Sequence, residues 1–333
     1  MKLENFRMSN AQTLSQFLQA HQPTGAHSAE VIAAITALAD AAVQIARLIS
    51  APNAEANLGA IKGSANADGD DQKALDVMAD EVITDALRDA GVATYLSEEQ
   101  DAPIALNAGG KIIVASDPLD GSSNIDTNVS VGTIFSVLDA AQGPLQAGRD
   151  QLAAGFFVYG PQTTLMLAMG AGAYAFQMDA AGAFWLQPWG ESGDGRVTIA
   201  PDTSEFAINA ANQRHWAPPI ATYIADCLAG TDGPREHNFN MRWVGSLVAD
   251  AWRIFRRGGV FLYPNDSRKG YNDGRLRLVY EAAPIAFIVK AAGGDATNGV
   301  TAILDIVPTQ LHQRVPLVFG SANEVDVIAG YHD

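Results

Sequence analysis

Cysteine is almost absent from this chain, since Cys227 is the single cysteine among 333 residues. One thiol cannot form a disulfide within the chain, so a disulfide-stabilised secreted scaffold and an intrachain dithiol switch are both excluded. The composition instead fits a reducing compartment, and we expect a cytoplasmic protein. Cys227 lies in the helical-looking segment "YIADCLAG", where we expect it to be a small residue of the core.

Positive charge is also scarce. The chain has 21 lysines and arginines against 37 aspartates and glutamates, a formal net charge of −16. This balance argues against a protein that coats nucleic acid or an anionic membrane, so we expect neither as a partner. A phosphorylated small-molecule substrate is compatible with it, provided that the site itself supplies cations. With 48% hydrophobic and 17% charged residues, the chain is expected to fold into a globular structure.

Long uninterrupted apolar runs are missing too. The N-terminus, "MKLENFRMSN", mixes charges and lacks the apolar stretch of a signal peptide. Residues 151–178 carry no charge and are long enough to cross a bilayer, but Gly155, Gly160 and Gly170 help to divide them into short strand-like pieces. Within them "GAGAYA" matches the glycine pattern of dinucleotide-binding oxidoreductases. No helix-forming segment follows it, which disfavours that alternative.

The patterns of apolar residues divide the chain near residue 190, where the polar stretch "QPWGESGDGR" is typical of a linker. We expect residues 1–190 to form an α+β domain with a mostly antiparallel sheet, and residues 191–333 to form an α/β domain. The expected helices are 30–49, 73–90, 246–257 and one from near Pro284 to Gly293. The expected strands are 92–96, 112–115, 129–138, several within 151–187, 260–263 and 275–280.

Acidic and hydroxyl side chains gather in "SDPLDGSSNID", residues 116–126, directly after the apolar run "KIIVA". Asp-Pro and Asp-Gly are common turn formers, so a simple turn is one interpretation. The other is a metal site that handles phosphate. Pro118 biases Asp117 towards an extended backbone, and Asp117 and Asp120 could then bracket a cation with the carbonyl of Leu119.

The second half of this stretch offers groups that bind phosphate. Gly121 lies where the chain must turn sharply, and Ser122 and Ser123 follow it with hydroxyl and N–H groups. Asp126 has no such role and is expected to be local structure.

Other acidic residues lie near the start of a predicted helix. In "DGDDQKALD", Asp76 falls between Ile83 and Leu87 on the helical wheel, within the apolar arc. Burying a carboxylate is costly unless it is ligated or hydrogen-bonded, so a functional role for Asp76 is one interpretation. The alternative is a boundary position from which the carboxylate reaches solvent.

Charged pairs occur at two further positions. Glu98 and Glu99 follow the predicted strand "VATYL", where adjacent glutamates are often merely solvated. Arg275 and Arg277 lie two apart on a predicted strand and so share one face, which indicates either a phosphate clamp or a solvated face. Glu281 follows them at a predicted strand-to-helix junction.

Taken together, "SEEQ", "DPLDGSSNID" and "GRLRLVYEAAP" resemble segments of class 1 fructose-1,6-bisphosphatases, which belong to the Mg²⁺-dependent, Li⁺-sensitive sugar-phosphate and inositol-phosphate phosphatases. The segments "VGTIFSVLD", "GSLVADAWRIF", "GGVFLYP", "LDIVPTQLHQR" and "GSANEV" extend the likeness, in the family's order, over roughly residues 30–330. The resemblance implies a layered αβαβα sandwich of two sheets and the Mg²⁺-dependent hydrolysis of fructose 1,6-bisphosphate to fructose 6-phosphate and phosphate.

The resemblance also implies a metal centre. Two or three Mg²⁺ ions per subunit, or Mn²⁺ in their place, would be held by Glu98, Asp117, Asp120, Glu281 and the carbonyl of Leu119. Asp76 and Glu99 match a carboxylate pair that positions and deprotonates the attacking water, and Asp70 matches an acidic residue near a third metal position. Metals acidify water and offset charge on a transferring phosphoryl group, so these roles are chemically consistent.

The resemblance also implies which residues bind the substrate. The 1-phosphate would rest on the turn Asp120, Gly121, Ser122 and Ser123. The other end of the sugar would be bound by Asn209, Arg242, Trp243, Tyr263, Arg275 and Arg277. In the family the arginine that matches Arg242 reaches in from a neighbouring subunit, so a homotetramer with shared sites is expected.

Departures from the family pattern leave alternatives open. Trp243 and Asn212 stand where phosphate-binding tyrosines are common, so sedoheptulose 1,7-bisphosphate is an alternative or additional substrate. An inositol monophosphatase would not need the three arginines, and a catalytically dead sensor would have lost an acidic residue. The segment "TGAHSAEV", and Ile112 beside Lys111, depart from the AMP-binding pattern, so AMP inhibition is expected to be weak or absent. The sequence leaves open whether the pathway is gluconeogenesis or the Calvin cycle.

Overall fold

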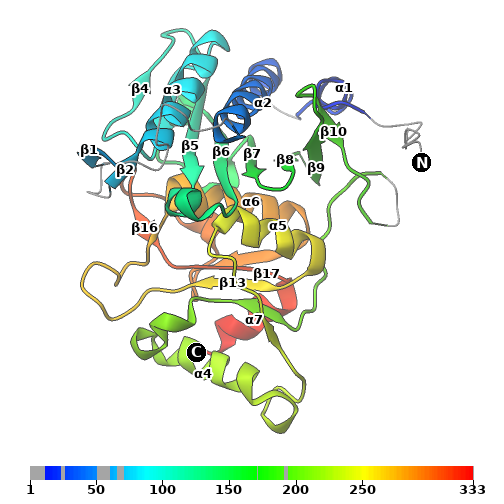
Figure 1. Ribbon diagram of the computed structural model, residues 1–333, viewed down its shortest axis with the longest axis vertical. Coiled ribbons are helices and arrows are strands. Elements are labelled where there is room, and N and C mark those ends of the chain that lie inside the picture. Colours follow the sequence, from blue (N-terminus) through cyan, green and yellow to red (C-terminus); the bar gives the residue numbers. More distant parts are fainter. Residues whose placement is uncertain are drawn as a thin grey trace.

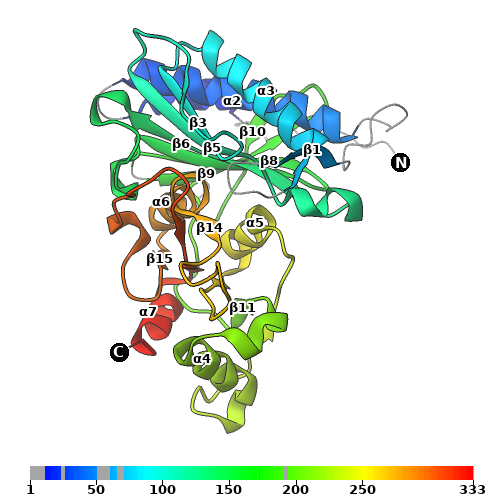
Figure 2. The ribbon, with the colours of Figure 1, turned by 90° about the vertical axis from the view of Figure 1, so that its left-hand side faces the viewer.

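Helices and two main sheets alternate as layers in the computed structural model, which describes residues 12–23, 27–50, 61–65, 71–170, 172–190 and 194–332. From top to bottom, Figure 1 shows an outer helical layer, an eight-stranded sheet, a middle helical layer, a five-stranded sheet and a second outer helical layer. The same order is visible after a quarter turn in Figure 2. The expected αβαβα sandwich is therefore confirmed.

The first outer layer consists of α1 (Leu14–Ala20), α2 (Ser28–Ser50) and α3 (Ala74–Asp89). These agree with the expected helices 30–49 and 73–90. By length and composition alone, α2 is apolar enough to cross a membrane. Its residues Val31, Ile35 and Leu38 are buried in one cluster with Phe135 and Phe157 of the first sheet, as in a core helix.

The eight-stranded sheet runs in the order β10 (Phe184–Leu186), β9 (Gly172–Met178), β8 (Thr163–Met169), β7 (Ala153–Tyr159), β6 (Val131–Asp139), β5 (Ile112–Asp120), β3 (Thr94–Ser97) and β4 (Ile104–Ala105). Among the described strand pairs of this sheet, only β3–β5 is parallel. The uncharged residues 151–178 form β7, β8 and β9, as expected. Since β9 begins at Gly172, "GAGAYA" leads into a strand and not a helix, which argues against the dinucleotide-binding alternative.

Strand β5 is longer than the expected 112–115 and continues to Asp120. Its pairing with β6 shifts register between Asp117 and Asp120. Pro118 lies inside this irregularity, where the missing N–H of proline is tolerated. The Asp-Pro-Leu-Asp stretch is therefore the irregular end of a buried strand, and Gly121, with a φ of 78°, turns the chain into the short 3₁₀ helix Ser122–Thr127.

The middle layer holds α5 (Leu247–Arg257) and α6 (Ala283–Ala291), which share one buried cluster with residues of both sheets. The five-stranded sheet runs in the order β12 (Asn240–Met241), β11 (Glu205–Ala207), β13 (Val260–Tyr263), β17 (Leu317–Gly320) and β15 (Asp295–Thr297). Helices α4 (Pro218–Ala229) and α7 (Ala322–Gly330) cover its other face. Cys227 of α4 is buried there, as predicted.

The expected strand 275–280 is wrong. Strand β14 comprises only Leu276–Arg277 and pairs with β16 (Arg314–Val315). Residues Leu278–Ala282 form one turn of π-helix that leads directly into α6. The run is buried throughout, so it shows no alternation that would distinguish a strand from a buried helical turn. A further short pair, β1 (Ile61–Ala65) and β2 (Asp71–Lys73), precedes α3.

Candidate active site

A cavity of about 470 Å³ lies where the ends of β3 and β5 meet β14 and the π-helical turn. Most of the residues singled out in the sequence line this cavity, although they come from distant parts of the chain. Its lining consists of Asp76, Glu98, Glu99, Asp117, Leu119, Asp120, Gly121, Ser122, Ser123, Tyr263, Tyr271, Arg275, Leu276, Arg277, Glu281 and Arg314.

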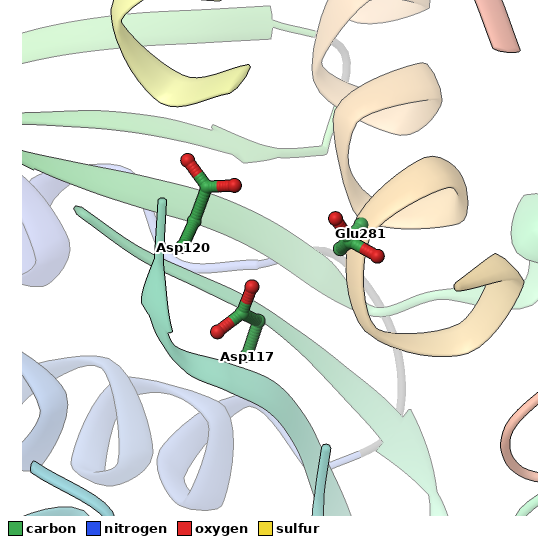
Figure 3. Close-up of side chains that lie close together, drawn as sticks. All are labelled: Asp117, Asp120 and Glu281. Atoms are coloured by element: carbon green, nitrogen blue, oxygen red, sulfur yellow. The ribbon is translucent and has the colours of Figure 1, made fainter. Parts of the chain in front are cut away.

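Three buried carboxylates converge in it. Asp117 and Asp120 come from β5, and Glu281 comes from the π-helical turn on the opposite side (Figure 3). Each offers an oxygen atom, and these atoms all lie within 4.8 Å of one another. Such a cluster of oxygen donors matches what hard divalent cations prefer.

The irregular end of β5 is held in place by hydrogen bonds from several elements. The Leu119 amide donates to Asp117 Oδ1 at 2.9 Å, and Thr133 Oγ1 donates to the Pro118 carbonyl at 2.8 Å. The Val248 amide, at the N-terminal end of α5, donates to Asp120 Oδ2 at 3.1 Å. Asp117, Asp120 and Glu281 all line the cavity.

The negative charges of these buried carboxylates would be stabilised by a bound cation. Burial, and then the negative charge of Glu98, raise the pKa values of Asp117 and Glu281 well above their usual range. Burial also raises the pKa of Asp120 to about 7, although its hydrogen bond from Val248 acts in the opposite direction. Ionised carboxylates packed this closely repel one another, which is unfavourable unless a positive charge lies beside them. The donor set and its buried charge therefore fit a divalent metal.

The remaining acidic residues surround this cluster. Glu98 and Glu99 follow β3 and line the cavity. Glu98 Oε1 lies 3.7 Å from Arg277 Nε, so Glu98 is not simply solvated. Asp76, in the first turn of α3, has only 3% of its surface exposed, which contradicts the solvent-facing alternative. Asp70 lies outside the described residues.

The other half of the cavity is aromatic and basic. The Arg275 guanidinium lies between the rings of Tyr263 and Tyr271, with its Cζ 5.8 Å and 4.1 Å from their centroids. Tyr263 in turn stacks on Trp243, with ring centroids 6.1 Å apart. A small recess lined by Asn209, Asn212, Tyr263 and Arg275 adjoins this half.

Arg275 and Arg277 do not share a strand face as expected, because β14 begins after Arg275. Arg277 is buried beside Glu98, and its Nη1 donates to the Arg275 carbonyl at 3.1 Å. Both arginines nevertheless line the same cavity. Arg242 is not among the described residues that line it. Its half-exposed side chain lies 3.7 Å from Glu205 of β11.

Sequence reasoning missed Tyr271 and Arg314. Tyr271 lies in the connection between β13 and β14. Arg314 lies on β16 and is the residue paired directly opposite Arg277 of β14. The position of Arg314 within "LDIVPTQLHQR" was a usable signal, because this segment belongs to the family resemblance. Tyr271 lies in a polar, glycine-rich loop that carries no such signal.

Comparisons with known proteins agree with this geometry. The family model described as "Fructose-1-6-bisphosphatase, N-terminal domain" matches residues 12–188, and the one described as "Fructose-1-6-bisphosphatase, C-terminal domain" matches residues 199–333. The class 1 fructose-1,6-bisphosphatase of Azorhizobium caulinodans is 53% identical over 329 residues, 96% of this chain and 99% of the relative. That of Rhizobium meliloti is 51% identical over 314 residues, 92% of this chain and 88% of the relative.

The fold agrees as well. The crystal structure of Leishmania major fructose-1,6-bisphosphatase in holo form matches with a TM-score of 0.88 at 34% identity, covering 97% of this chain and 99% of that chain. Its T-state structure matches with a TM-score of 0.83 at 32% identity and similar coverage. Sequence, fold and cavity thus lead to one conclusion: this chain belongs to the class 1 fructose-1,6-bisphosphatase family.

Proposed function

We propose that this protein hydrolyses fructose 1,6-bisphosphate to fructose 6-phosphate and inorganic phosphate with the help of Mg²⁺. The observation that carries the proposal is a cavity that joins a buried carboxylate cluster, a serine-containing turn and an arginine held between tyrosines. A bisphosphate needs both a site of chemistry and a second anion-binding site, and this cavity offers groups for each.

Glu98, Asp117, Asp120, Glu281 and the carbonyl of Leu119 are the residues that would hold the metal, two or three ions per subunit. A divalent cation there would offset charge on the phosphoryl group and make a water molecule more acidic. Mg²⁺ is the ion we propose, because an all-oxygen donor set suits it, with Mn²⁺ as an alternative.

Asp76 and Glu99 would accept the proton of the attacking water, since both line the cavity beside the cluster. Asp70, which lies outside the described residues, is proposed to act near a third metal position only because the family resemblance implies it. Gly121, Ser122 and Ser123 would hold the 1-phosphate through amide and hydroxyl groups, because the positive φ of Gly121 turns this segment towards the cavity.

The second phosphate would bind at the aromatic half, to Arg275, Tyr263 and the recess formed with Asn209. Trp243 would support this end through its stacking on Tyr263. Arg277, beside Glu98, would offset negative charge between the two ends.

Assembly and regulation are further parts of the proposal. Arg242 would complete the second-phosphate site of an adjacent subunit in a homotetramer. Its half-exposed side chain lies 3.7 Å from Glu205 and is not among the described residues that line the cavity of its own chain, which supports this role. Weak or absent AMP inhibition is proposed because the segment "TGAHSAEV" and Ile112 beside Lys111 depart from the AMP-binding pattern. A cytoplasmic location fits the single buried thiol.

The direct test is phosphate release from fructose 1,6-bisphosphate by the purified protein, with Mg²⁺ and with EDTA. We expect turnover only with the metal. Parallel assays on sedoheptulose 1,7-bisphosphate and inositol 1-phosphate rank the alternatives, and faster turnover of inositol 1-phosphate would overturn the proposal.

A further inference from the structure

Residues 264–274, in the connection between β13 and β14, form a loop at the rim of the cavity that is closed by backbone hydrogen bonds. The Asp266 amide donates to the Tyr271 carbonyl at 3.1 Å, and the Gly274 amide donates to the same carbonyl at 3.1 Å. Gly274 has a φ of 86°, and a Cβ at this position would lie 2.3 Å from the Val315 carbonyl carbon. The end of the loop is therefore fixed against β16, which places Tyr271 beside Arg275.

The side chain of Arg268 holds this loop together through several contacts. Arg268 forms a two-pronged ion pair with Asp266, with Nε 3.0 Å from Oδ1 and Nη2 in contact with Oδ2. The Arg268 Nη2 atom also donates to Asn212 Oδ1 at 3.0 Å, and the guanidinium lies 4.9 Å from the centroid of the Tyr271 ring. Because the carboxylate of Asp266 offsets its charge, we do not expect Arg268 to bind the anionic substrate itself. Its role is to position the loop and the Tyr271 ring.

The hydroxyl of Tyr271 has a defined orientation. Arg275 Nη2 donates to Tyr271 Oη at 3.1 Å, and the two side chains are stacked. Since the phenol oxygen accepts this bond, its own hydrogen is left to donate to another acceptor. Tyr271 and Arg275 both line the cavity, so the phenol hydrogen and the remaining guanidinium hydrogens are available to one anion.

We propose that Tyr271 is a further substrate-binding residue, which donates its phenol hydrogen to the second phosphate of the bisphosphate beside Arg275. This inference rests on the proposed function, because it assumes that the second phosphate binds at the aromatic half of the cavity. It also explains how the second-phosphate site retains a second phenol although Trp243 and Asn212 provide none there.

The test is Tyr271→Phe in the full-length protein with Mg²⁺. This change keeps the ring that packs on Arg268 and Arg275 and removes only the hydroxyl. We expect the KM for fructose 1,6-bisphosphate and the Ki for fructose 6-phosphate as a product inhibitor to rise together by about tenfold, with kcat within about twofold of the unmodified protein. The matched control is Tyr331→Phe, which removes a hydroxyl bonded to Asp226 far from the cavity and should change neither constant.

Arg275→Ala separates failure of this inference from failure of the proposed function. If Arg275→Ala raises the Ki for fructose 6-phosphate and Tyr271→Phe leaves it within about twofold, the Tyr271 assignment is wrong and the site stands. If neither variant raises it, the second phosphate does not bind at this end and both proposals fail. A fall in kcat at unchanged KM and Ki in Tyr271→Phe also contradicts a binding role.

Discussion

Glu98 and Glu99 are neighbours in sequence but are expected to have different functions. Glu98 lies 3.7 Å from Arg277, and its negative charge raises the pKa of Asp117 more than that of Glu99 does. Both glutamates line the cavity, as Asp76 does. We expect Glu99→Gln to lower kcat by about 10²- to 10⁴-fold, the usual contribution of a general base. The KM for fructose 1,6-bisphosphate should change little, because glutamine keeps the size of the side chain.

Glu98→Gln is the matched control for this prediction. It should raise the Mg²⁺ concentration required for half-maximal activity, an effect that we do not expect of Glu99→Gln. Steady-state phosphate release at several Mg²⁺ concentrations distinguishes the two patterns. Normal kcat in Glu99→Gln would remove this residue from the proton-transfer step.

At the residue scale, the sequence predicted the carboxylates better than the remainder of the cavity. Asp76 could be identified because a carboxylate in an apolar helical arc is physically costly, and it proved to be buried. Tyr271 could not, because its position depends on how Gly274 and Arg268 fold one loop. Such a loop conformation depends on tertiary contacts that no sequence periodicity encodes.

At the element scale, helix α5 supports the proposed metal site, because its N-terminal turn packs against β6 at Gly132 and donates to Asp120. A Cβ on Gly132 would lie 2.2 Å from the Phe157 carbonyl oxygen and 2.6 Å from Val248 Cγ2. The amide of Val248 is the group that donates to Asp120. We therefore expect Gly132→Ala to lower the free energy of unfolding by about 1–3 kcal/mol and to weaken Mg²⁺ binding.

Urea unfolding and a Mg²⁺ titration of activity check both effects. Gly109→Ala is the matched control, because a Cβ at Gly109 has no atom within 4 Å, and it should alter neither quantity by much. Unchanged Mg²⁺ binding in a destabilised Gly132→Ala protein would show that α5 does not help to position Asp120.

Elements were predictable where one physical signal dominated. Strand 260–263 was predicted correctly because Gly258 and Gly259 end α5 directly before it. The strand expected over 275–280 failed because residues 276–280 are all buried, so apolar composition could not distinguish a strand from a π-helical turn. The division of the chain near residue 190 stays a prediction.

For the whole molecule, the buried carboxylates link stability to pH and to metal. Their raised pKa values mean that the metal-free folded protein binds protons more tightly than the unfolded chain does. Its stability should therefore fall as the pH rises from about 4 through the pKa of about 7 of Asp120. Mg²⁺ binds the ionised form, so it should raise the melting temperature more at pH 8 than at pH 5.5.

Thermal melts with EDTA and with Mg²⁺ at the two pH values measure this difference. Asp120→Asn should reduce the Mg²⁺-induced shift, since it removes one charged ligand. An equal shift at both pH values would indicate that Mg²⁺ binds elsewhere.

Active sites shared between subunits would be a property of the whole oligomer. If Arg242 completes the site of an adjacent subunit, Arg242→Ala should raise the KM for fructose 1,6-bisphosphate by about tenfold or more, because a charge-assisted bond to phosphate is lost. The control is Arg257→Ala, which removes a different arginine that pairs with Glu205 and should leave this KM unchanged.

Hybrid oligomers decide whether Arg242 acts across the interface. When Arg242→Ala and Glu99→Gln subunits assemble together, a subunit with intact Glu99 receives an intact arginine from its Glu99→Gln neighbour, and one complete site is restored. Activity at low substrate concentration should then exceed the mean of the two parent proteins. If Arg242 served its own chain, every site in the hybrid would carry one defect and no activity would be regained. Co-expression of the two subunits with different affinity tags, followed by purification on both tags, isolates the hybrid in which this comparison is made.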